Sequence, residues 1–102
     1  MRIEFERSGG LMGRTVACSV DTETLPADEA HELRELVERA DFFALPESPP
    51  GSAARSDQFA YTVRIESEGR GHTVMTSDDA APSALVPLLD RLSRMARRSR
   101  GE

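Results

Sequence analysis

The stretch of residues 57–92 constrains the fold more than any other part of the chain. In its first run, apolar side chains occupy every second position: Phe59, Tyr61, Val63 and Ile65. A period of two is typical of a strand with one buried face. In a second run, residues 71–76, the side chains of His72, Val74 and Thr76 are two positions apart and so belong to one face of a strand. Gly69, between the runs, can adopt the positive φ of a hairpin loop, so the sequence predicts a β-hairpin.

An amphipathic segment follows this hairpin. Its apolar residues have helical spacing: Leu85, Leu88, Leu89 and Leu92. We expect Asp78 and Asp79 to cap a helix that begins near Pro82. Pro87 lacks a backbone donor, so we expect a kink or a short first turn there. The segment predicts a helix that covers the hairpin.

The N-terminal half shows the same two periods. Apolar side chains occupy every second position in two runs. They are Ile3 and Phe5 in residues 2–6, and Val16, Cys18 and Val20 in residues 15–20. Pro26, Asp28 and Glu29 suit the first turn of a helix. The helix continues with Ala30, Leu33, Leu36, Val37 and Ala40. The sequence predicts the order β-β-α-β-β-α. We expect a two-layer α+β domain in which a four-stranded antiparallel sheet carries two helices on one face.

This order gathers three irregular connections at one end of the sheet: residues 9–13, 46–56 and 77–81. If the first strand runs up, its loop lies at the top, the first helix climbs back to the top, and the second helix starts there. Residues 46–56 contain three Pro and three Ser without periodicity, and form a long connection for so small a domain. Irregular loops on one end of a rigid sheet are a plausible working surface.

Composition narrows the class of protein. The 102 residues predict one domain over residues 1–95, with an Arg-rich tail over residues 96–102. The formal net charge of −5 disfavours a general attraction to nucleic acid or to anionic membranes. Five Arg between Arg91 and Arg100 can contact nucleic acid. They can also simply complement the helix dipole, which we favour because no aromatic residues lie among them.

The sequence also bears on the compartment. No apolar run approaches the roughly 20 residues of a membrane span. The N-terminus has no apolar core of a signal peptide. One cysteine, Cys18, cannot form a disulfide within the chain. We therefore expect a cytoplasmic protein.

Candidate catalytic and metal-ligating residues are few. Cys18 and His72 lie on predicted strands and could in principle pair as nucleophile and base. However, Cys18 shares the parity of the core, where a thiol is usually inert, and His72 is expected to be a half-buried structural residue. His31 begins a zinc-protease motif whose second histidine is replaced by Glu35. Gly9 and Gly10 lack phosphate-loop spacing. We predict no catalytic residue, no cofactor and no metal, which leaves a binding role.

Several blocks of the sequence resemble the emfourin family, small protein inhibitors of thermolysin-like metallopeptidases. The blocks are Ser8-Gly9-Gly10, Leu25-Pro26-Ala27, Leu36-Val37, Ala40-Asp41-Phe42-Phe43-Ala44-Leu45-Pro46, Asp57-Gln58-Phe59-Ala60-Tyr61, His72-Thr73-Val74, and Pro82 with Leu85, Pro87-Leu88-Leu89 and Leu92. They extend over roughly residues 3–92 and consist mostly of core and turn residues. The resemblance therefore indicates the fold more strongly than the activity.

The resemblance implies a reversible inhibitor that plugs the active-site cleft of a peptidase with its loops. Such peptidases favour a bulky apolar side chain just after the scissile bond, which Leu11 or Met12 can supply. The expected peptidase-binding residues are Gly9, Gly10, Leu11, Met12, Gly13, Pro50, Gly51, Ser52 and Ala53. We expect a monomer whose partner is the peptidase. The alternatives are a non-inhibitory interaction module of the same fold, folding of Leu11 and Met12 back onto the sheet edge, and a slack connector at residues 46–56.

Overall fold

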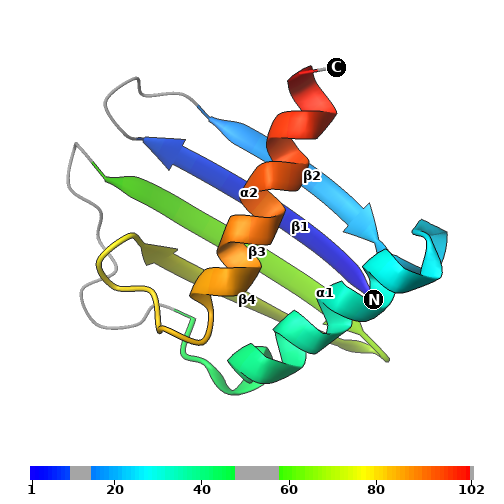
Figure 1. The fold of residues 1–102 in the computed structure, drawn as a ribbon. Coiled ribbons are helices and arrows are strands. Elements are labelled where there is room, and N and C mark those ends of the chain that lie inside the picture. The colour runs from blue at the N-terminus through cyan, green and yellow to red at the C-terminus, as the bar shows by residue number, and fades with distance from the viewer. Residues whose placement is uncertain (10–14, 48–57, 102) are drawn as a thin grey trace.

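The computed structural model describes the backbone of residues 1–9, 15–47 and 58–101, and the side chains of these segments as far as residue 97. Four strands form one sheet in the order β2-β1-β3-β4, with each neighbouring pair antiparallel (Figure 1). The elements are β1 (Arg2–Gly9), β2 (Val16–Asp21), the 3₁₀ turn η1 (Thr22–Thr24), α1 (Ala27–Ala40), the 3₁₀ turn η2 (Phe42–Ala44), β3 (Phe59–Ser67), β4 (Arg70–Ser77) and α2 (Val86–Gly101). The predicted order β-β-α-β-β-α is confirmed.

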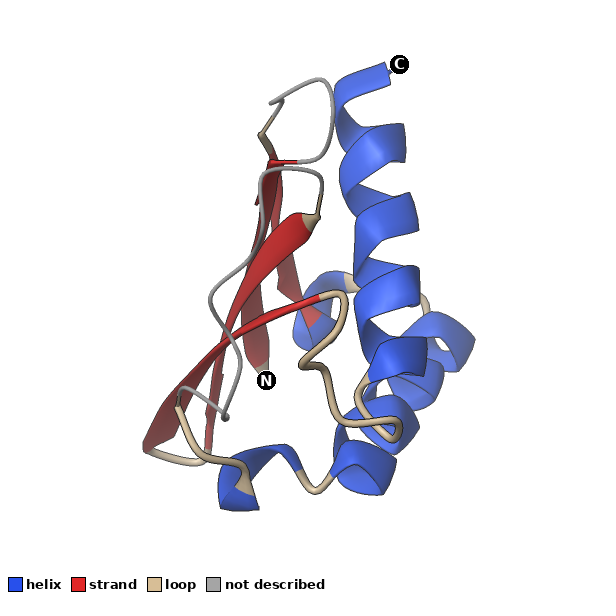
Figure 2. Ribbon diagram, turned by 90° about the vertical axis from the view of Figure 1, so that its left-hand side faces the viewer, coloured by secondary structure: helices blue, strands red, loops and turns tan. Residues whose placement is uncertain are grey.

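Both helices lie on the same side of the sheet (Figure 2). The strand residues at the predicted apolar parity face them, and the following are buried: Ile3, Phe5, Val16, Val20, Val63, Ile65 and Val74. The helices contribute Leu33, Val37, Leu88, Leu92 and Ala96 to the same core. Each large apolar side chain buried in this way stabilises the fold by about 1.5–3 kcal/mol. The predicted two-layer α+β fold is confirmed.

The turn between β3 and β4 has the predicted hairpin geometry. Ser67 pairs with Arg70, which leaves a two-residue loop of Glu68 and Gly69. Both loop residues have positive φ, 53° and 79°. Two positive φ values in succession define a type I′ turn, whose twist matches that of the flanking strands.

α1 lies across the end of the sheet that carries the β3–β4 turn, which we call the hairpin end. β2 reaches this end at Asp21, which pairs with Arg2, and Arg2 also pairs with Glu66. After α1, the ring of Phe43 lies 4.5 Å from the guanidinium carbon of Arg70. The helix therefore starts and finishes at the hairpin end, and the prediction that it climbs to the opposite end is wrong. The reason is packing, because α2 already covers β1 and β2 (Figure 1).

α2 begins at Val86, later than the predicted start near Pro82. The preceding residues form a turn in which the N–H of Leu85 donates to the carbonyl of Pro82 over 2.9 Å. Pro87 is the second residue of α2, in the first turn, where its missing donor has no helical partner to lose. The predicted helix is therefore present, and its predicted start is wrong.

α2 continues to Gly101 through the residues predicted as a tail, and Ala96 is fully buried. Arg91 joins the two helices, with guanidinium nitrogens 2.7 Å from Glu32 and 3.8 Å from Glu29 of α1. Within the described ranges, neither helix is long and apolar enough to cross a membrane.

Candidate functional site

The end of the sheet opposite the β3–β4 turn, which we call the rim, is where the predicted contact loops join the strands. Gly9, which ends β1, pairs with Phe59, which starts β3. Ser77, which ends β4, pairs with Ala60. β2 also starts at this end (Figure 1). The chain thus leaves the sheet at the rim before residues 10–14 and re-enters it there after them. It enters the sheet at the rim a second time after residues 48–57.

The connection over residues 46–56 does not begin at the rim. Its first residues come from the hairpin end and lie along the outer edge of β4. The carbonyl oxygen of Leu45 is 2.6 Å from Nε2 of His72, and the carbonyl of Glu47 accepts a hydrogen bond from the N–H of Met75 over 2.7 Å. Placing the whole connection at the rim was therefore wrong. Residues 45–47 lack strand alternation, so sequence reasoning missed that they cover this sheet edge.

Of the predicted peptidase-binding residues, Gly9 is the one that the structure describes. The others lie outside the described residues: Gly10, Leu11, Met12, Gly13, Pro50, Gly51, Ser52 and Ala53. What the structure does define is the base from which both loops extend. The described residues at that base are Gly9, Gln58, Phe59 and the turn over residues 77–81.

Gly9 occupies a position that suits only glycine. Its φ is +94°, and a Cβ there would lie 2.7 Å from the carbonyl oxygen of Gln58. Gly69 at the hairpin end has a similar φ of +79°, but a Cβ there would meet nothing within 4 Å. The end of β1 is therefore packed closely against the residue that precedes β3.

The carboxylate of Asp78 ties the turn after β4 to the start of β3. Its Oδ2 accepts a hydrogen bond from the N–H of Phe59 over 3.0 Å, and its Oδ1 accepts from the hydroxyl of Tyr61 over 2.8 Å. The N–H of Asp78 donates in return to the carbonyl of Phe59 over 3.2 Å. We call these three bonds the Asp78 clamp. Beside it, Asp79 accepts from the side-chain amide of Gln58. The prediction that both aspartates cap α2 is wrong, because the carboxylate of Asp78 binds the start of β3 and that of Asp79 binds Gln58, the residue before it.

Aromatic and cationic side chains pack around the clamp. The ring of Tyr61 lies 6.2 Å from that of Phe5 and 6.4 Å from that of Phe59, and the guanidinium carbon of Arg7 lies 4.3 Å from the centre of the Phe59 ring. Burial, followed by the hydrogen bond to Asp78, raises the pKa of Tyr61 from 10.0 to about 12. The Tyr61 hydroxyl therefore remains a donor to Asp78 at neutral pH.

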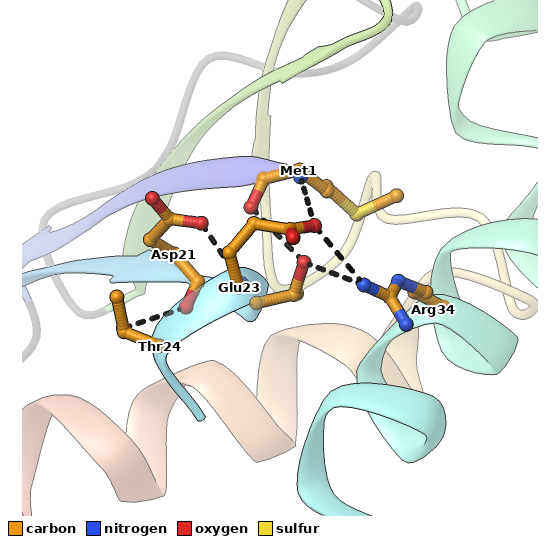
Figure 3. A network of polar contacts seen from close by, with 6 residues as sticks. Met1, Asp21, Glu23, Thr24 and Arg34 are labelled. Carbon is orange, nitrogen blue, oxygen red and sulfur yellow. Dashed lines mark hydrogen bonds and ion pairs between the residues drawn. The ribbon is translucent and has the colours of Figure 1, made fainter. Parts of the chain in front are cut away.

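The hairpin end carries a different polar network (Figure 3). Oδ1 of Asp21 accepts from the N–H of Glu23 over 2.9 Å, and the carbonyl of Asp21 accepts from the hydroxyl of Thr24 over 2.9 Å. The Glu23 carboxylate lies 3.3 Å from the Arg34 guanidinium and 3.9 Å from the Met1 amine. The side chain of Glu23 is 70% exposed, so solvent screens these ion pairs.

The structure also separates the residues considered for catalysis. Cys18 and His72 lie on β2 and β4, the two outer strands, so three strand spacings of about 4.8 Å stand between them. Burial raises the pKa of the Cys18 thiol from 9.0. His72 is half-buried against Phe42 and Phe43, as predicted. Over the described ranges, no group of three His, Cys, Asp or Glu is arranged to hold a metal ion.

Comparison with known proteins identifies one family. The sequence model of the family described as Emfourin matches residues 5–93. No curated protein matches the chain, and no solved structure does so. The matched range begins within β1, ends within α2 and includes the whole of β2, β3 and β4.

Proposed function

The chain belongs to the emfourin family, and from this premise we propose that it inhibits a thermolysin-like zinc metallopeptidase. Emfourins are an inhibitor family, so the chain is expected to act by binding rather than by catalysis. We propose that the loops at the rim enter the active-site cleft and obstruct it without a covalent step. The peptidase is the partner, and the inhibitor works as a monomer in the cytoplasm.

One observation carries this proposal: the strand end where the first loop begins and the strand start where the second loop ends are fastened to each other at one end of the sheet. Gly9 pairs with Phe59, and Asp78 holds Phe59 through both its side chain and its backbone. A base fixed in this way reduces the conformational entropy that the loops lose on binding. Pre-organised inhibitors of proteases characteristically move little when they bind.

Within the loops, we propose that Leu11 or Met12 fills the pocket that receives the residue after the scissile bond. Gly10 and Gly13 flank these two side chains in the sequence. Residues Pro50, Gly51, Ser52 and Ala53 would lie alongside in the same cleft. Prolines in this second loop limit the entropy that is lost when it becomes ordered.

The direct test is a titration of a thermolysin-like peptidase with the protein, using a peptide substrate. We expect the rate to fall in proportion to the complex formed and to recover on dilution. An unchanged rate at micromolar excess would contradict inhibition of that enzyme. Capture of the peptidase without any loss of rate would favour the alternative, a non-inhibitory interaction module.

A double variant, Leu11→Ala with Met12→Ala, tests the loop assignment. We expect the inhibition constant to rise by about 30-fold or more, since removal of two anchoring apolar side chains from an interface commonly costs about 2 kcal/mol or more. The matched control is Met75→Ala with Val86→Ala, which removes two exposed apolar side chains outside the proposed contact loops. A large fall in melting temperature in the loop variant would instead place Leu11 and Met12 in the core.

A further inference from the structure

We infer that Asp78 is a positioning residue of the inhibitor, which holds the rim so that a peptidase binds the loops but does not cleave them. The inference rests on the proposed function and adds to it a reason why a protein that enters a peptidase cleft survives there. Asp78 itself need not touch the peptidase. It acts on the residues from which the loops extend.

Phe59 lies where one end of each loop joins the sheet. Through the sheet it pairs with Gly9, where the first loop begins. The second loop ends next to it, at Gln58. Asp78 donates to and accepts from the backbone of Phe59, and Asp79 binds the side chain of Gln58. The turn after β4 thus fixes, through its aspartates, the place at which the two loops meet.

The clamp opposes hydrolysis of the loops by the peptidase. In peptide hydrolysis, the peptidase adds water to the carbonyl carbon, the C–N bond breaks, and a carboxylate and an amine are released. The reacting peptide must reach a near-attack geometry, and a misplacement of about 1 Å is costly. A loop with fixed roots resists this adjustment more than a loop with free roots does.

The carboxylate of Asp78 lies outside the core. Asp78 is exposed, whereas the large apolar residues beneath α2 are buried. Its loss should therefore loosen the rim locally and leave the sheet and helices folded. This separation allows the positioning role to be tested without unfolding the protein.

The experiment compares Asp78→Ala with Asp21→Ala. Both variants remove an exposed carboxylate that accepts from a backbone N–H, one at the rim and one at the hairpin end. Each is incubated with a thermolysin-like peptidase, and residual peptidase activity and the intact mass of the inhibitor are followed over time. For Asp78→Ala we expect inhibition about tenfold weaker at the start, because a loosened rim must become ordered on binding. That inhibition should then decay as the chain is cut between residues 9 and 15 or between 47 and 58. Asp21→Ala should remain intact and inhibitory.

Two further variants protect the test against misfolding. Asp78→Asn retains an oxygen that can accept from the Tyr61 hydroxyl, and Tyr61→Phe removes that hydroxyl alone. Both should give intermediate cleavage rates with an unchanged circular dichroism spectrum. If Asp78→Ala inhibits as tightly as the wild type and stays intact, the positioning role is wrong while the proposed function stands. If the wild-type protein does not inhibit at all, the proposed function is wrong and this inference falls with it.

Discussion

The two ends of the sheet use the same residue types for different purposes. Each end has a glycine with positive φ and an aspartate that accepts from a backbone N–H. At the rim, Gly9 lies close to the backbone of Gln58. Asp78, in the turn after β4, binds the first residue of β3. At the hairpin end, Gly69 is open, and Asp21 binds a residue two positions along its own chain. Contacts at the rim thus join distant segments, whereas those of Gly69 and Asp21 are local.

This difference indicates where a change in sequence will be felt. A local contact fixes one turn, and its loss is confined to that turn. A contact between distant segments fixes their relative positions, so its loss loosens every segment attached to it. The rim is where the proposed binding loops attach, which makes its few long-range contacts important for function as well as for stability.

The comparison between the glycines should show the largest effect. Gly9→Ala introduces both a strained φ and a Cβ 2.7 Å from a backbone oxygen, so we expect it to lower the free energy of unfolding by about 2–4 kcal/mol. Gly69→Ala has the strained φ alone, and about 1 kcal/mol is expected. Urea denaturation of the two variants measures the difference.

The same pair also tests the functional division of the molecule. Gly9→Ala should weaken inhibition at temperatures where the variant remains folded, because Gly9 pairs with Phe59, where the second loop joins the sheet. Gly69→Ala should inhibit like the wild type. Equal losses of stability in the two variants would show that the rim is no more tightly packed than the hairpin end.

The pH dependence of the rim gives a smaller effect. Tyr61 is the single tyrosine of a chain without tryptophan, so the absorbance of tyrosinate reports on the ionisation of Tyr61 alone. We expect its titration midpoint near pH 12 in the folded protein and near 10.0 in urea. Because the unfolded chain loses this proton more readily, the stability contributed by Tyr61 is complete below pH 10 and is lost as the pH rises toward 12.

Asp78→Ala should move the folded midpoint of Tyr61 toward 10.0, since it removes both the hydrogen bond and the nearby negative charge. A Cys18→Ser background avoids a second contribution, because burial also raises the pKa of that thiol. A midpoint that Asp78→Ala leaves unchanged would mean that burial alone sets the pKa of Tyr61.

Strand parity and helix spacing were enough to predict the fold. Ile3, Phe5, Val63 and Val74 are buried on one face because alternation depends only on local geometry and the need to cover apolar surface. The path of α1 was not predictable in this way, because it depends on which part of the buried face α2 has already taken. The start of α2 was missed for a related reason, since the local sequence does not show that Asp78 binds a distant strand.

The candidate site could be predicted only in part. Gly9 was selected as a loop residue, and its neighbours in space were not visible in the sequence. The clamp pairs Asp78 with Tyr61, which lies 17 positions away, and the β4 edge is covered through Leu45 and His72, 27 positions apart. Contacts of this kind appear only once the register of the sheet is known.

The smallest effect is expected from the surface ion pairs of the hairpin end. Glu23→Gln removes the charge that faces Arg34 over 3.3 Å, but keeps the N–H that Asp21 binds. Exposed pairs of this kind contribute about 0–1 kcal/mol, and salt screens them, so the small loss of stability should shrink further at high ionic strength. Inhibition should be unchanged, because this network lies at the end of the sheet opposite the loops. A clear loss of inhibition by Glu23→Gln, measured in the same peptidase titration, would mean that the hairpin end also contacts the peptidase, and the functional division between the two ends would be wrong.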